Sequence, residues 1–354
     1  MLTHSLATFG PLDLTGAIAS WPPMSFVLGL VAAATVVAIR ANTGHAAERG
    51  AGFTGGRRTS LRRRYAGEHV SLSIAGVAVT LGFLFEFLFR GYVWDGSGAS
   101  WWRVAAPLAV AFAGVTVALA VILTRGSGAA EHPVSPPVRR SWLSFSSPVS
   151  LTALAVTSLA LLATTVAAGI ASSPNGEGDW LWLVIPIPNA ADVDPLRVSF
   201  YGWVYGVPAL VGLGLLLLVV WRALDRNAVR SFLRPETVAI ERAARRRTAS
   251  GIVWLATGAC LLALAAAWRL VGNAGSVTTL TIDDASGGTS YDIAWRYAEL
   301  AAIAGGAAPI VEIVALCMLL VVGGSLVPRA DHASVVAPGS PAPRSSGTDV
   351  GYAR

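Results

Sequence analysis

Residues 221–250, WRALDRNAVRSFLRPETVAIERAARRRTAS, lie between two long apolar segments and are the most informative part of this chain. This stretch holds eight arginines and three acids. A strongly basic stretch between two segments of about 20 apolar residues is typical of a loop on the cytoplasmic side of a membrane. The stretch therefore predicts a polytopic membrane protein, and its charge indicates which way the neighbouring segments run.

The overall composition agrees with this prediction. Of the 354 residues, 54% are hydrophobic and 13% are charged, which is about half the charged fraction of an ordinary soluble domain. All 26 basic residues are arginine, so lysine-dependent sites such as a P-loop or a Schiff base are excluded. Abundant arginine, alanine and glycine without lysine also indicate a bacterial protein from a GC-rich genome.

Seven apolar segments are long enough, with their flanking residues, to cross a bilayer as helices. We therefore expect an all-α fold with spans at 24–39, 70–89, 104–124, 148–171, 199–221, 251–271 and 299–326. These spans make residues 1–327 one transmembrane domain. The Pro- and Ser-rich residues 328–354 are predicted to be a disordered cytoplasmic tail.

Two further features of the segments between spans can be interpreted. Tryptophans beside prolines in residues 172–198 predict a piece that lies in the headgroup layer without crossing the membrane. The N-terminus has no basic region before its first apolar run, so no cleavable signal peptide is expected.

Arginine is distributed unevenly between the two sides that seven spans would create. Loops 40–69, 125–147 and 222–250, together with the tail, carry 21 arginines and eight acids, whereas the other side carries five arginines and ten acids. Cytoplasmic loops carry the excess of basic residues. The sequence therefore predicts an N-terminus outside and a C-terminus inside, in the plasma membrane.

Glu312 is the sharpest candidate for a functional residue, because it lies near the middle of the seventh predicted span. An ionised carboxylate there costs about 2.5–3.5 kcal/mol on insertion scales. Gly305, Gly306 and Pro309 precede it and predict a broken helix, which is typical of ion and proton sites in transporters. A protonated acid that is hydrogen-bonded to a neighbouring helix explains the same residue without a function, and both interpretations stay open.

Glu86 is the second acid within a span. It precedes Arg90 by four residues, which is the favourable order for an ion pair on one helix. A structural ion pair is therefore the favoured interpretation.

Arginines recur every four residues at the start of the 221–250 stretch, at Arg222, Arg226, Arg230 and Arg234. Such spacing places them on one side of a helix, and we expect this face to contact anionic lipid headgroups. Docking of a membrane or cytoplasmic protein, such as an ATPase, is the alternative. Nucleic acid is not an expected partner, because these arginines are tied to the bilayer and no binding fold accompanies them.

The sequence contains no pattern that predicts a cofactor, a metal or a catalytic centre. The five histidines are scattered, and no GxSxG, HExxH, CxxC or GxxxxGK motif occurs. Cys260 and Cys317 both lie in apolar runs and are interpreted as packing residues.

Three functions are compatible with these observations. The first is a permease-like or accessory transport component in which Glu312 lines a polar path. The second is a non-catalytic scaffold or sensor that acts through its arginine-rich cytoplasmic loops. The third is a membrane enzyme for a lipid or cell-envelope substrate that uses outer acids such as Asp179, Asp283 or Asp284. The enzyme has the least support, since no catalytic spacing accompanies these acids.

Overall fold

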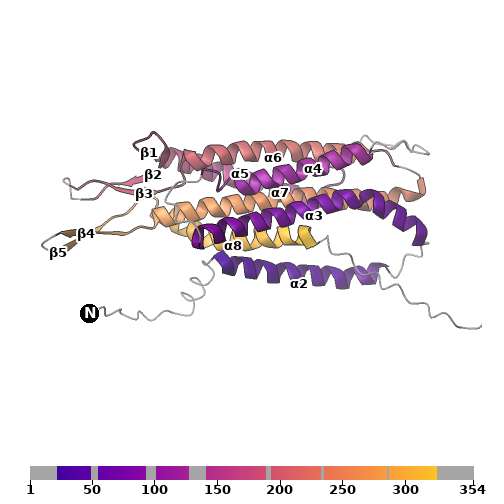
Figure 1. The fold of residues 1–354 in the computed structure, drawn as a ribbon, viewed down its shortest axis with the longest axis horizontal. Coiled ribbons are helices and arrows are strands. Elements are labelled where there is room, and N and C mark those ends of the chain that lie inside the picture. The colour runs from indigo at the N-terminus through magenta and orange to yellow at the C-terminus, as the bar shows by residue number, and fades with distance from the viewer. Residues whose placement is uncertain are drawn as a thin grey trace, which may run out of the picture.

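The protein is a bundle of long helices with two small sheets at one end (Figure 1). The computed structural model describes residues 22–48, 55–92, 101–126, 141–188, 193–232, 235–284 and 287–324. The helices are α2 (Pro22–Glu48), α3 (Gly55–Tyr92), α4 (Ala106–Gly126), α5 (Pro148–Ala171), α6 (Trp203–Val229), α7 (Val238–Gly275) and α8 (Ala298–Gly323). A short 3-10 turn, η1 (Pro235–Thr237), precedes α7.

Six helices in the described part of the chain, α3 to α8, are long and apolar enough to cross a membrane. The structure is therefore mostly helical and agrees with a multi-pass membrane protein, whereas its two small sheets depart from the predicted all-α fold. The apolar part of α2, Met24–Ile39, is shorter than these six. Several helices extend beyond the predicted spans, and α3 and α7 have 38 residues each. At 1.5 Å per residue each of these two is about 57 Å long, which exceeds the roughly 30 Å of a bilayer core.

Two antiparallel sheets lie at the same end of the bundle, which we call the sheet end (Figure 1). The first contains β1 (Ser173–Pro174), β2 (Trp180–Ile185) and β3 (Leu196–Ser199). The second is the hairpin of β4 (Thr279–Asp284) and β5 (Gly287–Asp292). The opposite end, where residues 230–237 connect α6 to α7, is called the arginine end.

The sheet of β1, β2 and β3 corrects the interpretation of residues 172–198. The tryptophans and prolines of this segment predict its position in a headgroup layer, but they miss its strands. In β2 the side chains of Leu181, Leu183 and Ile185 are buried and alternate with more exposed ones. This period of two is normal for a half-buried strand, but the sequence WLWLVI is apolar throughout and does not show it.

Helix α7 lies at the centre of the bundle and packs against α3, α4, α5, α6 and α8. Its contact with α8 depends on glycines. A Cβ atom on Gly272 would lie 2.6 Å from the Cα of Gly305, and one on Gly258 would lie 2.8 Å from the Cγ of Leu319. Small residues let the two backbones approach closely, which favours van der Waals contact between helices in a membrane. These two contacts also fix the antiparallel register of α7 and α8.

Candidate functional site

Glu312 of α8 forms an ion pair with Arg269 of α7, a residue that the sequence analysis did not single out. The Nε and Nη2 atoms of Arg269 both donate to Oε2 of Glu312, at 2.9 and 2.6 Å. The Glu312 side chain is 1% exposed, and that of Arg269 is 23% exposed. Oε1 of Glu312 is buried without a hydrogen-bond partner in the described part of the chain. The carboxyl is thus isolated from solvent, whereas the guanidinium is within reach of the surface.

The register of α7 and α8 shows the depth of this pair along the bundle. Because Gly272 meets Gly305 in antiparallel helices, Glu312 is level with Ala265. The Cα atom of Arg269 therefore lies about 6 Å nearer the sheet end than that of Glu312. The long side chain of Arg269 points back toward the middle of the bundle. The carboxyl of the pair thus lies near the middle of the bundle, and the backbone of its arginine lies closer to the sheet end.

Helix α2 covers the carboxyl from a third side. Ser25 is fully buried, and its hydroxyl interacts with the Glu312 carboxyl. One turn later, a Cβ atom on Gly29 would lie 2.8 Å from the Cβ of Leu316. The close approach at Gly29 explains why a short serine side chain of α2 can reach an acid on α8.

The predicted break in the helix before Glu312 is wrong. Helix α8 continues from Ala298 to Gly323 with Pro309 inside it. Proline removes only one backbone donor, the one that would bond the Gly305 carbonyl. Packing of Gly305 against Gly272 supports the backbone at this point, so the helix continues past the proline.

A second group of buried charges lies at the arginine end. We define the arginine-end cluster as Glu68, Arg230, Glu241 and Arg245, which are all buried. Arg230, at the end of α6, donates from Nη1 to Oε1 of Glu68 on α3 at 2.5 Å. Thr248 of α7 donates to the other oxygen of Glu68 at 3.0 Å. These bonds join three helices at one carboxylate.

The α7 half of the cluster holds the connection between α6 and α7. Arg245 donates to the backbone carbonyls of Arg230 and Ser231, at 2.6 and 2.8 Å. Its Nη2 atom lies 3.6 Å from Oε2 of Glu241. Thr237 donates to the other oxygen of Glu241 at 2.7 Å. Arg245 therefore stabilises the end of one helix and the start of the next.

The cluster changes the interpretation of the four periodic arginines. Arg222 and Arg226 are exposed on α6, as a lipid-facing side chain would be. Arg230 is 8% exposed and binds Glu68, so it packs inside the protein and does not share their surface. Helix α6 ends at Val229, and Arg234 lies outside the described residues. The helical period identified the exposed pair but could not show where the helix ends.

The other predicted candidates whose side chains are described, Glu86 and Asp179, do not belong to either group of charges. Glu86 is partly buried on α3, and the side chain of its predicted partner Arg90 lies outside the described part. Asp179 is exposed in the turn before β2, whereas the side chains of Asp283 and Asp284 are not described. Among the described residues no group of three metal-ligating side chains occurs.

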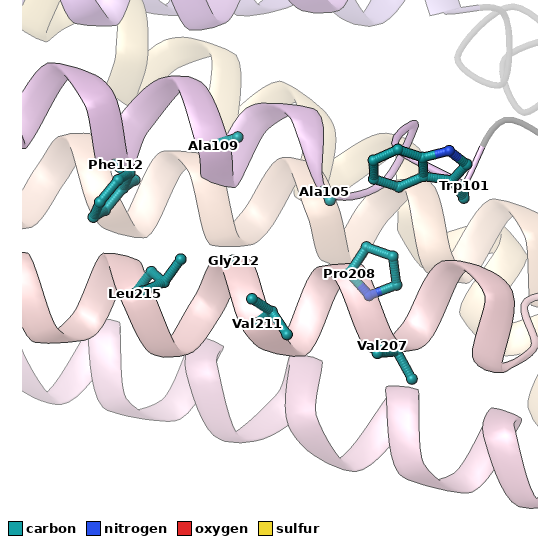
Figure 2. Close-up of a pocket in the computed structure, with 9 residues that line it drawn as sticks. All are labelled: Trp101, Ala105, Ala109, Phe112, Val207, Pro208, Val211, Gly212 and Leu215. Carbon is teal, nitrogen blue, oxygen red and sulfur yellow. The ribbon is translucent and has the colours of Figure 1, made fainter.

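An apolar groove of about 430 Å³ lies between α4 and α6. The Trp101 indole lies beside Pro208 at one end of it, with Phe112 and Leu215 at the other (Figure 2). Val207 is about half exposed on its wall. Such a surface suits a hydrocarbon environment and offers no acid–base or ion-binding group, so the chemistry lies elsewhere.

Comparison of the chain with protein families, with curated proteins and with solved structures finds no match. The function must therefore be argued from the Arg269–Glu312 pair and the arginine-end cluster.

Proposed function

We propose that this protein is a permease-like or accessory transport component that crosses the plasma membrane seven times, with Glu312 as its proton-carrying residue. The observation that supports this most directly is the ion pair of Glu312 and Arg269, which joins the apolar parts of α7 and α8. Ionisable residues within spans commonly belong to ion or proton pathways, because their burial is costly. If Glu312 served only to join helices, a neutral polar side chain could do the same without the cost of burying an ionisable group.

The pair has the features that proton exchange requires. The carboxyl is covered by α2, α7 and α8, so its protonation state is insulated from solvent until one of these helices moves. One carboxyl oxygen binds Arg269, and the other accepts no hydrogen bond from any residue that the structure describes. A proton added to the carboxyl would break the ion pair without breaking the fold, because Arg269 starts nearer the sheet end.

Proton flux in vesicles tests this function. In purified, reconstituted protein, Glu312→Gln should abolish proton-linked flux, since the amide keeps the shape of the side chain but cannot carry a proton. Glu177→Gln, which changes an exposed acid before β2, should leave flux unchanged. A Glu312→Gln variant with normal proton flux would end the transport role of this residue.

The proposed orientation places the sheet end outside and the arginine end in the cytoplasm. The excess of arginine in the loops and tail assigned to the cytoplasm supports this orientation. In a background without Cys260 and Cys317, Ser290→Cys on β5 should react with an impermeant thiol reagent in intact cells. Ser231→Cys, exposed beside the cluster, should react only after the membrane is opened. Labelling of Ser231→Cys in intact cells would reverse the orientation.

A scaffold or sensor is the second candidate, and one observation favours it. The acids of the arginine-end cluster are neutralised inside the protein, whereas other arginines at that end remain exposed: Arg222, Arg226, Arg242, Arg246 and Arg247. This distribution leaves a basic surface for anionic lipid headgroups, with a membrane or cytoplasmic protein such as an ATPase as the alternative partner. Stacking of Arg222 on the exposed Trp221, at 5.3 Å, favours the lipid, because this pairing is typical of a membrane interface.

A further inference from the structure

Three helices enclose the Glu312 carboxyl, and they are held in the bundle to different degrees. Helix α7 packs against five other helices, and α8 is fixed to it where Gly272 meets Gly305. Helix α3 also holds α8, because the Ser73 hydroxyl donates to the Val322 carbonyl at 3.0 Å. Helix α2, by contrast, lies at the edge of the bundle and packs mainly against α8 among the described elements (Figure 1). It is therefore the covering helix that can separate with the smallest loss of packing.

Two contacts between α2 and α8 show that these helices run parallel. A Cβ atom on Gly29 would lie 2.8 Å from the Cβ of Leu316, and one on Gly324 would lie 3.9 Å from Cγ2 of Val37. Gly29 and Val37 are eight residues apart, and so are Leu316 and Gly324. The same register, continued one turn back, places the first turn of α2 level with Glu312.

The face of α2 that meets α8 carries small side chains. Ser25, Gly29 and Ala33 follow one another at intervals of four residues, and Ser25 and Ala33 are both buried. Small residues let the helices approach closely, which allows the Ser25 hydroxyl to reach the Glu312 carboxyl. Separation of α2 from α8 would cost this packing and the serine contact. Separation of α7 from α8 would also break the ion pair with Arg269.

We propose that the first turns of α2 are the gate of the proton site: when they separate from α8, water reaches Glu312, and when they return, the carboxyl is closed off, while α7 and α8 stay packed. This inference rests on the proposed function and names the movement that regulates access to its acid. A buried carboxyl exchanges its proton only when water or another carrier reaches it. Local opening of a peripheral element is the least costly way to admit that carrier.

The partly exposed Arg269 side chain marks where the opened site would meet the surface. Its guanidinium contacts Oε2 of Glu312 at 2.6 Å, whereas the Glu312 side chain itself is almost fully buried. The first turn of α2, with Ser25, lies against the same carboxyl. Displacement of this turn would therefore extend the exposed surface from the guanidinium to the acid without repacking the centre of the bundle.

The rate at which a hydrophobic carbodiimide labels Glu312 tests the gate. It is measured at fixed pH by mass spectrometry of the purified full-length protein in vesicles. Gly29→Leu adds a bulky side chain where a Cβ atom alone would already lie 2.8 Å from the Cβ of Leu316, so it should hold α2 away from α8. Labelling should then be about tenfold faster, because the open fraction sets the rate. Gly214→Leu in α6, where a Cβ atom would meet nothing within 4 Å, should leave the rate unchanged.

A disulfide at the same contact gives the opposite test. In a background without Cys260 and Cys317, Gly29→Cys and Leu316→Cys bring two Cβ atoms about 1 Å closer than the ~3.8 Å of a disulfide, so a small adjustment lets the bond form. The oxidised protein should be labelled about tenfold more slowly than its reduced form, since α2 can no longer open. A reductant should restore the rate.

The disulfide comparison decides the inference if Gly29→Leu does not fold or if the two tests differ, because both of its states are the same chain. Equal labelling of Glu312 in the oxidised and reduced forms would overturn the inference. A rise in Gly214→Leu as large as that in Gly29→Leu would also overturn it, because the effect would then not arise at the contact of α2 with α8.

This result is separable from the test of proton flux, because labelling is measured without transport. If Glu312→Gln loses proton flux but the disulfide does not slow labelling of Glu312, the proposed function stands and the gate fails. If the disulfide slows labelling and wild type shows no proton-linked flux, the gate stands and the transport function fails.

Discussion

The arginine-end cluster and the Arg269–Glu312 pair both bury arginine beside glutamate, but they are built differently. In the cluster two arginines and two glutamates share bonds with hydroxyls and backbone carbonyls of three helices and the connection between two of them. The pair has one arginine, one glutamate and a serine from a peripheral helix. Side chains of the cluster are at most 5% exposed, whereas that of Arg269 is 23% exposed.

This difference separates structural charges from exchangeable ones. Removal of one partner of a buried ion pair strongly destabilises the folded protein. The loss is larger when the remaining charged group cannot reach solvent or another partner. The arginines of the cluster cannot move without leaving carbonyls and carboxylates unpaired. Arg269 is 23% exposed and lies nearer the sheet end than Glu312. For this reason the proposed function uses the pair, whereas the bonds of the cluster hold helices together.

The largest effect is expected from Arg245→Ala. It leaves Glu241 without its arginine and the carbonyls of Arg230 and Ser231 without their donors, so the free energy of unfolding should fall by about 3–5 kcal/mol. Thermal melting of purified protein in detergent measures the loss. The neighbouring Arg246→Ala changes an exposed arginine and should stay within about 0.5 kcal/mol of wild type. Equal losses for the two variants would remove the distinction between cluster and surface.

A smaller effect is expected at the pair. Glu312→Ala should lower the free energy of unfolding by about 1–2 kcal/mol, because the bond between α7 and α8 is lost but Arg269 can turn toward the surface. Glu312→Gln should cost less, since an amide oxygen still accepts from Arg269. The same melting assay compares both with Glu68→Gln, which removes the carboxylate that pairs with the buried Arg230. If Glu312→Gln destabilises more than Glu68→Gln, the roles of the two groups are reversed.

The smallest effect on stability is expected at the exposed arginines of α6. Replacement of both Arg222 and Arg226 by glutamine should change the free energy of unfolding by less than about 0.5 kcal/mol. It should, however, reduce the number of phosphatidylglycerol molecules that the purified protein retains in native mass spectrometry. Retention by wild type should also fall as salt rises, because the attraction is screened. Equal retention of anionic and neutral lipids by wild type would favour a protein partner.

The sequence predicted the candidate acid but not its environment. Glu312 was identified because an acid is conspicuous in an apolar run. Its partner Arg269 is 43 residues away and lies near the end of a span, where an arginine resembles an ordinary outer residue. Arg230 and Glu68 are 162 residues apart, and neither has a local pattern that indicates the other. The pair of Glu241 and Arg245 is the exception, because a spacing of four places both on one side of a helix.

The prediction of a helix break shows the limit of local rules in another way. Glycine and proline before Glu312 weaken a helix in isolation. In the bundle, contact between Gly305 and Gly272 supports the same segment, so tertiary packing overrides the local preference.

The helical, multi-pass class and the uneven distribution of arginine among the loops could both be predicted from the sequence. Each is a sum over neighbouring residues: the hydrophobicity of about 20 positions in a row, or the number of arginines in a loop. Which arginines are buried, and which acids they pair with, became clear only from the folded structure. Those features depend on contacts between distant segments, on a glycine that lets two helices approach, and on where a helix ends. These contacts made Arg230 part of a structural cluster and Arg269 the counter-ion of Glu312.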